Sequence, residues 1–216
     1  MNYAASLALS LFSTTGPAAR FILSVGSTPV ANSIPPTPQF RNLNGVLELH
    51  AGNYPLLDLQ QESTRLVDYD RISIRVLATV VSYYPGRGAD GGDEALCDAG
   101  SVALSKDTGP SGGFGDVTKL GCRARVSRES VKWKVKKASQ EHGILVRHAS
   151  APRGEQSGCN SDADRGETLQ VGDMVEIVPQ HACLAAAAHP WFYIVDSDLL
   201  DSAEKIVDVW VPWKGW

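Results

Sequence analysis

An imidazole and a thiol separated by one residue form the sharpest chemical signal in the sequence. They belong to His181 and Cys183, which closely follow the apolar segment 174–178. On an extended backbone, side chains two positions apart point to the same side, so both could reach one cation. Imidazole nitrogen and thiolate sulfur are ligands of Zn²⁺, and two protein ligands leave positions open for water or substrate. A packed histidine beside a buried cysteine gives the same short pattern, so the spacing alone leaves both interpretations open.

The turn Gly26-Ser27-Thr28 is a second candidate, in this case for phosphate. It follows the apolar run 21–25, which is typical of a strand buried on both faces in a parallel sheet or barrel. Backbone N–H groups and hydroxyls at the C-terminal end of such a strand can hold a phosphate, and glycine lets the anion approach the backbone. An ordinary turn before Pro29 accounts for the same residues equally well.

Other polar residues carry weaker signals. Asp98 could bring a carboxylate near a site, but its neighbours Ala99 and Gly100 indicate a turn. Glu141 and His142 resemble an acid–imidazole pair, but adjacent residues of a strand point to opposite faces, which favours a structural role. The sequence contains no nucleophile elbow, Walker loop or dinucleotide fingerprint. We therefore assign no catalytic residue.

Two kinds of pattern would have to position these residues. Residues 1–20 are compatible with a helix, and 21–25 and 45–50 are short apolar segments that suit an α/β architecture. From about residue 70 the pattern is β, because apolar and polar side chains alternate along 72–81 and 131–136. Further strands are expected at 144–147, 174–178, 191–195 and 206–211, and 189–193 is expected to be a core strand that starts with a proline. Segment 150–167 has no periodicity and is predicted to be a surface insertion in which Cys159 has no role.

The composition of the chain excludes several classes of protein. Of its 216 residues, 43% are hydrophobic and 20% charged, which excludes wholesale disorder. The net charge is -4 and the lysines and arginines are scattered, so we expect no nucleic-acid partner. No predominantly apolar run approaches the roughly 18 residues that span a membrane. The apolar segment 4–12 lacks the preceding basic residues of a signal peptide, and four cysteines are too few for a disulfide scaffold, so we expect a reduced, cytoplasmic protein.

In combination, the ordered motifs of the chain resemble the C-terminal part of the eukaryotic-type D-serine dehydratases, a family shared with D-threonine aldolase. These motifs lie at 24–29, 48–54, 76–82, 98–101, 139–143, 178–183 and 193–196. Each motif is short, but together they span residues 21–216 almost continuously. The specificity of the resemblance lies in their order.

The resemblance implies a fold like that of alanine racemase. Such a fold has an N-terminal (β/α)₈ barrel that holds pyridoxal 5′-phosphate and a C-terminal β domain that holds zinc. It predicts that residues 1–69 are the α/β remnant of the barrel and that residues 70–216 are a mainly antiparallel β domain. Carried over to this chain, His181 and Cys183 become zinc ligands. Gly26, Ser27 and Thr28 become contacts of the cofactor's phosphate.

The implied activity is that of a lyase, which converts D-serine to pyruvate and ammonia. Pyridoxal phosphate would act as the electron sink when the α-proton leaves, and zinc would bind the departing hydroxyl as a Lewis acid. The resembling aldolases favour an aspartate where Cys183 stands, so the thiol favours the dehydratase. A D-threonine aldolase and a non-catalytic metal-binding β domain remain the alternatives. The expected partners are a small D-amino acid and, for full-length relatives, a second subunit.

The chain departs from the family pattern ahead of the β domain. Only about 70 residues precede that domain, whereas a complete barrel takes about 200 or more. The resemblance implies a Schiff-base lysine near the start of the barrel, but no lysine precedes Lys106. We therefore expect a truncated member of the family that has no dehydratase activity alone. Apolar surface left around 21–25 and 46–49 should make the isolated chain self-associate.

Overall fold

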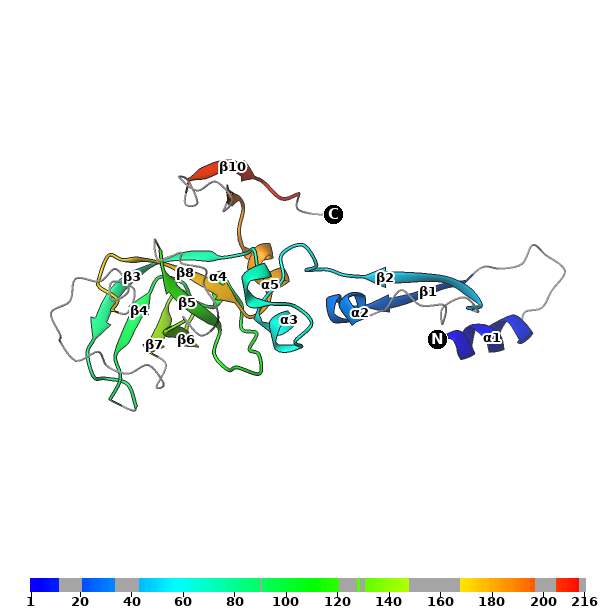
Figure 1. The fold of residues 1–216 in the computed structure, drawn as a ribbon, viewed down its shortest axis with the longest axis horizontal. Helices are drawn as coiled ribbons and strands as arrows, with labels where there is room; N and C mark the ends of the chain where they lie inside the picture. The colour runs from blue at the N-terminus through cyan, green and yellow to red at the C-terminus, as the bar shows by residue number, and fades with distance from the viewer. Residues whose placement is uncertain are drawn as a thin grey trace.

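A closed six-stranded barrel is the largest unit of the structure, a computed structural model that describes residues 1–11, 21–33, 43–89, 91–120, 128, 131–147, 168–196 and 205–213 (Figure 1). Its strands follow the order β3-β4-β7-β6-β5-β8, and every neighbouring pair is antiparallel. They are β3 (Val76–Tyr84), β4 (Glu94–Cys97), β5 (Gly115–Lys119), β6 (Trp133–Ala138), β7 (Gly143–Arg147) and β8 (Met174–Pro179). The predicted mainly antiparallel β domain is therefore confirmed.

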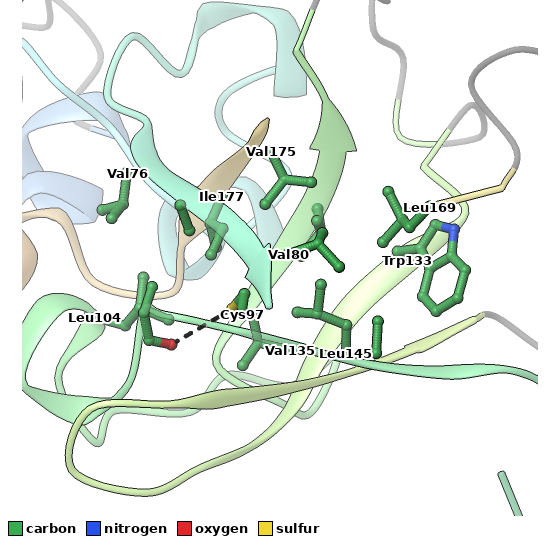
Figure 2. Packing of buried hydrophobic residues seen from close by; sticks show 14 of the residues in the cluster. Val76, Val80, Cys97, Leu104, Trp133, Val135, Leu145, Leu169, Val175 and Ile177 are labelled. Atoms are coloured by element: carbon green, nitrogen blue, oxygen red, sulfur yellow. Dashed lines mark hydrogen bonds between the residues drawn. The ribbon is translucent and has the colours of Figure 1, made fainter. Parts of the chain in front are cut away.

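The alternation of side chains explains how the barrel closes around its core. Along β3, Val76, Ala78 and Val80 are buried, whereas the intervening Leu77 is exposed. Figure 2 shows the buried side chains of the barrel strands, among them Trp133 of β6, converging in the interior. Each fully buried aliphatic side chain contributes about 1.5–3 kcal/mol. Ile177 of β8, the strand that leads to His181, belongs to this cluster.

Two barrel strands, β4 and β5, are not predicted from the sequence. β4 has four residues, and β5 begins at Gly115, the last residue of a glycine-rich stretch (109–115) that is typical of a linker. Gly115 pairs with Pro179 of β8, and a Cβ atom added to it would lie 2.7 Å from the Val178 carbonyl oxygen. The glycine therefore belongs to a strand because only it allows the two backbones to approach so closely.

A two-stranded parallel sheet precedes the barrel and extends away from it (Figure 1). Its strands are β1 (Phe21–Gly26) and β2 (Gly45–His50), accompanied by the helices α1 (Asn2–Leu11) and α2 (Thr28–Ser33). Both strands are predicted correctly from the sequence. The prediction that β1 is buried on both faces is wrong, because Leu23 is its only buried residue and Ile22 is 66% exposed. The predicted continuation of the first helix over 12–20 lies outside the described residues.

Short helices precede the first barrel strand, lie between β4 and β5, and follow the last barrel strand. They are α3 (Leu59–Ser63), the 3₁₀ helix η2 (Tyr69–Arg71), α4 (Ser101–Leu104) and α5 (Ala182–Ala188). A second cluster of buried residues joins α3 and η2 to Ala182 of α5 and Val178 of β8. Ile72 and Ile74, which the alternation places on a strand, pack in this second cluster ahead of β3. The end of β8 is thereby held between two apolar clusters.

The last two strands form a separate antiparallel sheet, β9 (Phe192–Val195) and β10 (Ile206–Trp210). Trp191, Tyr193 and every residue of β10 are exposed, so the expectation that 189–193 is a core strand is wrong. The predicted insertion at 150–167, with Cys159, lies outside the described residues. Among the described helices, none is long and apolar enough to cross a membrane.

Candidate functional site

His181 lies between the end of β8 and the first residue of α5. Its backbone is extended, and it occupies the N-cap position of the helix without a capping hydrogen bond from its side chain. The ring nitrogen Nδ1 lies 2.6 Å from Oδ2 of Asp107, on the loop that follows α4. Within the described part of the chain, Nε2 has no hydrogen-bond partner. The ring is therefore held through one nitrogen, which leaves the other for a ligand.

Cys183 lies on the first turn of α5 rather than on extended backbone, because the helix begins at Ala182. The expectation that His181 and Cys183 share one face of a strand is therefore wrong. The thiol is exposed, and desolvation by its surroundings, followed by the nearby Asp58 carboxylate, raises its pKa. The two residues remain neighbours across the junction of strand and helix. They offer one imidazole and one thiol, the donor types that zinc takes.

Two possible donors, His181 and Cys183, stand at the start of α5. Among the described residues, no group of three or more His, Cys, Asp or Glu side chains is arranged to hold a metal ion. Two protein donors can form part of a catalytic zinc site, in which other ligands complete the coordination. The donor chemistry of His181 and Cys183 thus fits zinc, and their role as its ligands stays a prediction.

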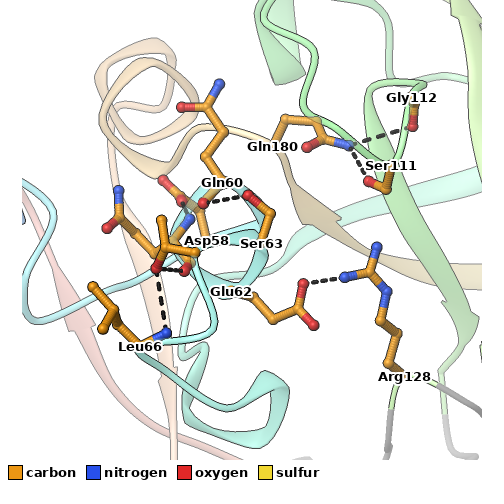
Figure 3. A network of polar contacts seen from close by, with 11 residues as sticks. Asp58, Gln60, Glu62, Ser63, Leu66, Ser111, Gly112, Arg128 and Gln180 are labelled. Atoms are coloured by element: carbon orange, nitrogen blue, oxygen red, sulfur yellow. Dashed lines mark hydrogen bonds and ion pairs between the residues drawn. The ribbon is translucent and has the colours of Figure 1, made fainter. Parts of the chain in front are cut away.

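Asp58 holds the helix that carries Cys183. The carboxylate is fully buried, and its Oδ2 accepts hydrogen bonds from the Ala182 backbone N–H at 2.8 Å and the Asn53 side-chain amide at 2.5 Å. Its Oδ1 accepts the backbone N–H of Gln61 and caps α3 (Figure 3). Sequence reasoning missed Asp58. An aspartate three residues ahead of a glutamine is a capping signal that could have identified it.

The predicted phosphate turn lies where β1 ends. Ser27 has a backbone φ of 114°, a value that residues other than glycine rarely adopt. Its backbone N–H donates to the His50 carbonyl at 3.0 Å. Gly26 and Ser27 are exposed, whereas Thr28 is buried at the start of α2. The Ser27 hydroxyl and the open face of Gly26 are therefore the groups that an incoming phosphate would meet. Phosphate binding by Gly26, Ser27 and Thr28 stays a prediction.

The loop that follows β2 links this turn to the pair of donors. Gly26 is paired with His50 in the parallel sheet. Two residues further on, Gly52 lies beside Cys183, since a Cβ atom added to Gly52 would be 3.7 Å from the thiol sulfur. The structure thus brings the C-terminal ends of β1 and β2 near the start of α5. The two sites predicted separately from the sequence share one region.

A polar trio on the exposed face of β1 and β2 also lies in this region. Nε2 of His50 is 2.7 Å from the Ser24 hydroxyl and 2.7 Å from the Glu48 carboxylate. Because one ring nitrogen makes both contacts, the trio lacks the relay of a serine hydrolase, in which each nitrogen has its own partner. The sequence does not reveal it, because Ser24 joins the trio through the strand register alone.

Asp98 and His142, two weaker candidates from the sequence, make contacts that support the barrel. Asp98 accepts the backbone N–H of Thr79 at 2.6 Å and so fixes the end of β4 against β3. His142 is exposed in the turn between β6 and β7, where its carbonyl accepts the Ser139 N–H. Neither residue lies at the start of α5, so neither is added to the candidate site.

Comparisons with known proteins agree with the resemblance noted in the sequence. The family model described as "Putative serine dehydratase domain" matches residues 73–195. The D-serine dehydratase of Schizosaccharomyces pombe is 37% identical over 215 residues, which cover 99% of this chain and 45% of the relative. That of Saccharomyces cerevisiae is 32% identical, over 91% of this chain and 42% of the relative. The chain therefore spans less than half the length of the curated relatives it matches.

Solved structures show the same likeness in the fold. D-threo-3-hydroxyaspartate dehydratase from Delftia sp. HT23 matches with a TM-score of 0.65 and 30% identity, over 98% of this chain and 48% of that one. A Cys-to-Ala variant of that dehydratase in its metal-free form gives a TM-score of 0.66 with 30% identity, over 100% and 48%. An alanine racemase-like protein from Idiomarina loihiensis gives 0.61 with 28% identity, over 90% and 44%. The structural neighbours are thus alanine racemase-like proteins.

Proposed function

Because the chain belongs to the serine dehydratase domain family, we propose that it is the C-terminal part of a D-serine dehydratase, which releases pyruvate and ammonia from D-serine. Two fungal relatives that carry this name support the substrate. The Delftia relative is named for the dehydration of another D-amino acid with a 3-hydroxyl group, which supports the reaction class. The parallel pair β1 and β2 would be the last part of a (β/α)₈ barrel.

The observation that carries the proposal is the contact of His181 Nδ1 with Asp107, two residues ahead of the exposed Cys183. Histidines that bind metals usually donate their other ring N–H to a carboxylate or carbonyl. His181 and Cys183 would therefore hold zinc. The bound metal would supply a Lewis acid for the hydroxyl group that leaves the substrate.

The turn at the end of β1 would hold the phosphate of pyridoxal 5′-phosphate, which supplies an electron sink for the loss of the α-proton. Gly26 leaves the backbone open to the anion, and the exposed Ser27 can donate from its hydroxyl. The His50 carbonyl fixes the backbone of Ser27 in its unusual conformation. No lysine precedes Lys106 in the sequence, so the lysine that binds the cofactor would come from outside this chain.

The proposal can be tested with a chimera. The part of the S. pombe relative that precedes its match to this chain is joined to residues 1–216. We expect the chimera, supplied with zinc and pyridoxal phosphate, to release pyruvate from D-serine, and the 216-residue chain alone to release none. His181→Ala and Cys183→Ala in the chimera should lose bound zinc and at least about 100-fold in rate.

The same assay separates the alternatives. Release of glycine and an aldehyde from D-threonine would identify an aldolase instead. A folded chimera that binds both cofactors and acts on neither amino acid would overturn the assignment and favour a non-catalytic metal-binding domain.

A further inference from the structure

We infer that Asp107 is the positioning residue of His181: it holds the imidazole in the Nδ1–H tautomer and leaves the lone pair of Nε2 for the metal. The inference rests on the proposed function, because it takes His181 to be a metal ligand. Nothing in the sequence points to Asp107, which lies 74 residues before its partner.

The chemistry of the two groups sets the direction of the hydrogen bond. Nδ1 of His181 and Oδ2 of Asp107 are 2.6 Å apart, and an ionised carboxylate can only accept. The ring must therefore donate from Nδ1, so that a neutral ring carries its lone pair on Nε2. The two side chains are only 30% and 40% exposed, which limits competition from water. The contact thus selects one tautomer and one orientation of the ring.

The structure argues against a simple helix-capping role for His181. A capping side chain accepts a hydrogen bond from the first turn of its helix, and the imidazole makes no such bond. Asp58 accepts the N–H of Ala182 in its place. Because Asp58 satisfies the start of α5, the His181 ring is free to turn toward Asp107.

One side of the loop that carries Asp107 is anchored to α3. The side-chain amide of Gln60 donates to the Thr108 carbonyl at 3.2 Å, next to Asp107 in the chain. The Ser105 hydroxyl accepts the backbone N–H of Asp107 at 3.1 Å. These two hydrogen bonds hold the segment that carries the Asp107 carboxylate in place.

Gln180 anchors the other side of the loop. It is buried, directly precedes His181, and donates from Nε2 to the Ser111 hydroxyl at 3.3 Å and the Gly112 carbonyl at 3.4 Å (Figure 3). A Cβ atom on Gly109 would lie 2.3 Å from the Gln180 side-chain oxygen, so the loop passes close to this side chain. Two consecutive residues thus bind one loop, which couples the position of the carboxylate to that of the ring.

Two measurements on the full 216-residue chain test the inference. The first is the ¹⁵N spectrum of the histidine rings at a pH where they are neutral, with the His181 signals assigned by their loss in His181→Ala. We expect the Nδ1–H tautomer in the wild type. Asp107→Asn has the same shape, but its amide can either accept from or donate to Nδ1, so the preference for the Nδ1–H tautomer should weaken and an Nε2–H population should appear. The exposed Asp70→Ala on η2 is the control and should leave the signals unchanged.

The second measurement is a Co²⁺ titration read by the sulfur-to-cobalt charge-transfer band. We expect Asp107→Asn to bind cobalt about 10-fold or more weakly than the wild type. The urea midpoint of this variant should stay unchanged, because a merely structural contact would alter stability instead.

An unchanged tautomer together with unchanged cobalt affinity in Asp107→Asn would overturn the inference. So would an Nε2–H tautomer in the wild type. A wild-type chain that takes up no cobalt would overturn the metal site of the proposed function. In that case the ring spectrum still decides whether Asp107 fixes the imidazole.

Discussion

The carboxylate of Asp58 accepts the backbone N–H of Ala182 at 2.8 Å and so joins two segments that lie 124 residues apart. Asp58 follows the loop that leads out of β2, whereas Ala182 opens the helix that carries Cys183. The buried Asp58 carboxylate therefore ties the segment that follows β2 to the segment that follows β8. The relative position of the predicted phosphate turn and the predicted metal ligands depends on this contact.

Replacement of Asp58 is expected to destabilise the chain strongly. Asp58→Ala removes the cap of α3, worth about 1 kcal/mol, and leaves the Ala182 N–H without its partner, at about 1–3 kcal/mol. We expect the free energy of unfolding to fall by about 3 kcal/mol in urea titrations. Asp70→Ala, at an exposed aspartate of η2, should change it by less than about 0.5 kcal/mol. Equal stability of the two variants would show that the Asp58 contacts do not hold the fold.

Replacement of Gly100, at the start of α4, should also lower the free energy of unfolding. A Cβ atom on Gly100 would lie 2.5 Å from the His142 nitrogen and 2.6 Å from the Gln140 and Ser139 carbonyl oxygens. All three are backbone atoms of the turn between β6 and β7, so they cannot rotate away. Gly100→Ala should therefore cost about 2 kcal/mol or more in thermal or urea unfolding.

Gly92→Ala is the matched control for this substitution, because nothing lies within 4 Å of the added atom. We expect its unfolding midpoint to remain within error of the wild type. A similar loss in both variants would attribute the effect to glycine flexibility and not to the close approach at Gly100.

Sequence reasoning recovered the parts of the fold that depend on periodicity. Val76, Ala78 and Val80 alternate with outward-facing residues, and such alternation is visible without coordinates. β5 was missed because its first residue, Gly115, is a strand residue only through the close approach of β8. Contacts of this kind depend on a partner that lies far away in the sequence.

The candidate site was also predictable only in part, because some of its contacts join residues that lie far apart in the sequence. The residue types at His181 and Cys183 are readable, but the backbone between them was assigned wrongly as extended. The alanines of 185–188 are a helix signal that could have corrected this. Asp107 and Asp58 could not be connected to the site, because long-range packing alone brings them to the start of α5.

Stability should depend on pH through Asp116 of β5. Burial raises the pKa of this carboxyl, although the Arg128 guanidinium acts in the opposite direction. A raised pKa in the folded state favours folding while the group is protonated, at pH values below its unfolded pKa of about 3.9. This contribution is lost as the pH rises through the folded pKa. Asp116→Asn should therefore be more stable than the wild type at pH 7.

Urea titrations at several pH values check this sign. The advantage of Asp116→Asn should shrink toward pH 3.5, where Asp116 is mostly protonated in both states. Arg128 keeps its ion pair with Glu62 in the variant, so it does not become an unpaired charge. A variant that is less stable than the wild type at pH 7 would show that attraction to Arg128 outweighs the burial of Asp116.

The two described cysteines should differ sharply in reactivity. Cys97 is completely buried, and burial raises the pKa of its thiol, whereas Cys183 is exposed. In a Cys122→Ser/Cys159→Ser background, we expect a maleimide to label Cys183 first and Cys97 roughly 100-fold or more slowly, through unfolding. Zn²⁺ should slow the labelling of Cys183 if it is a ligand. Fast labelling of Cys97 in the native chain would contradict the closed barrel core.

Self-association is expected to arise from the parallel sheet and not from the barrel. Within the part of the chain that the structure describes, β1 and β2 pair only with each other, and Ile22 and Val46 are 66% and 55% exposed. Apolar side chains beside unpaired strand edges favour edge-to-edge contacts between molecules. We expect the apparent mass of the chain in light scattering to rise with concentration.

A lysine at an edge strand opposes such contacts, so Ile22→Lys should reduce the concentration dependence. The matched control is Leu77→Lys on β3, which is 44% exposed but belongs to the closed barrel, where no edge is left unpaired. We expect the control to associate like the wild type, because removal of apolar surface alone leaves the open edges unchanged. A wild-type chain that stays monomeric at all concentrations, or an equal effect of the two lysines, would show that the open sheet does not drive association.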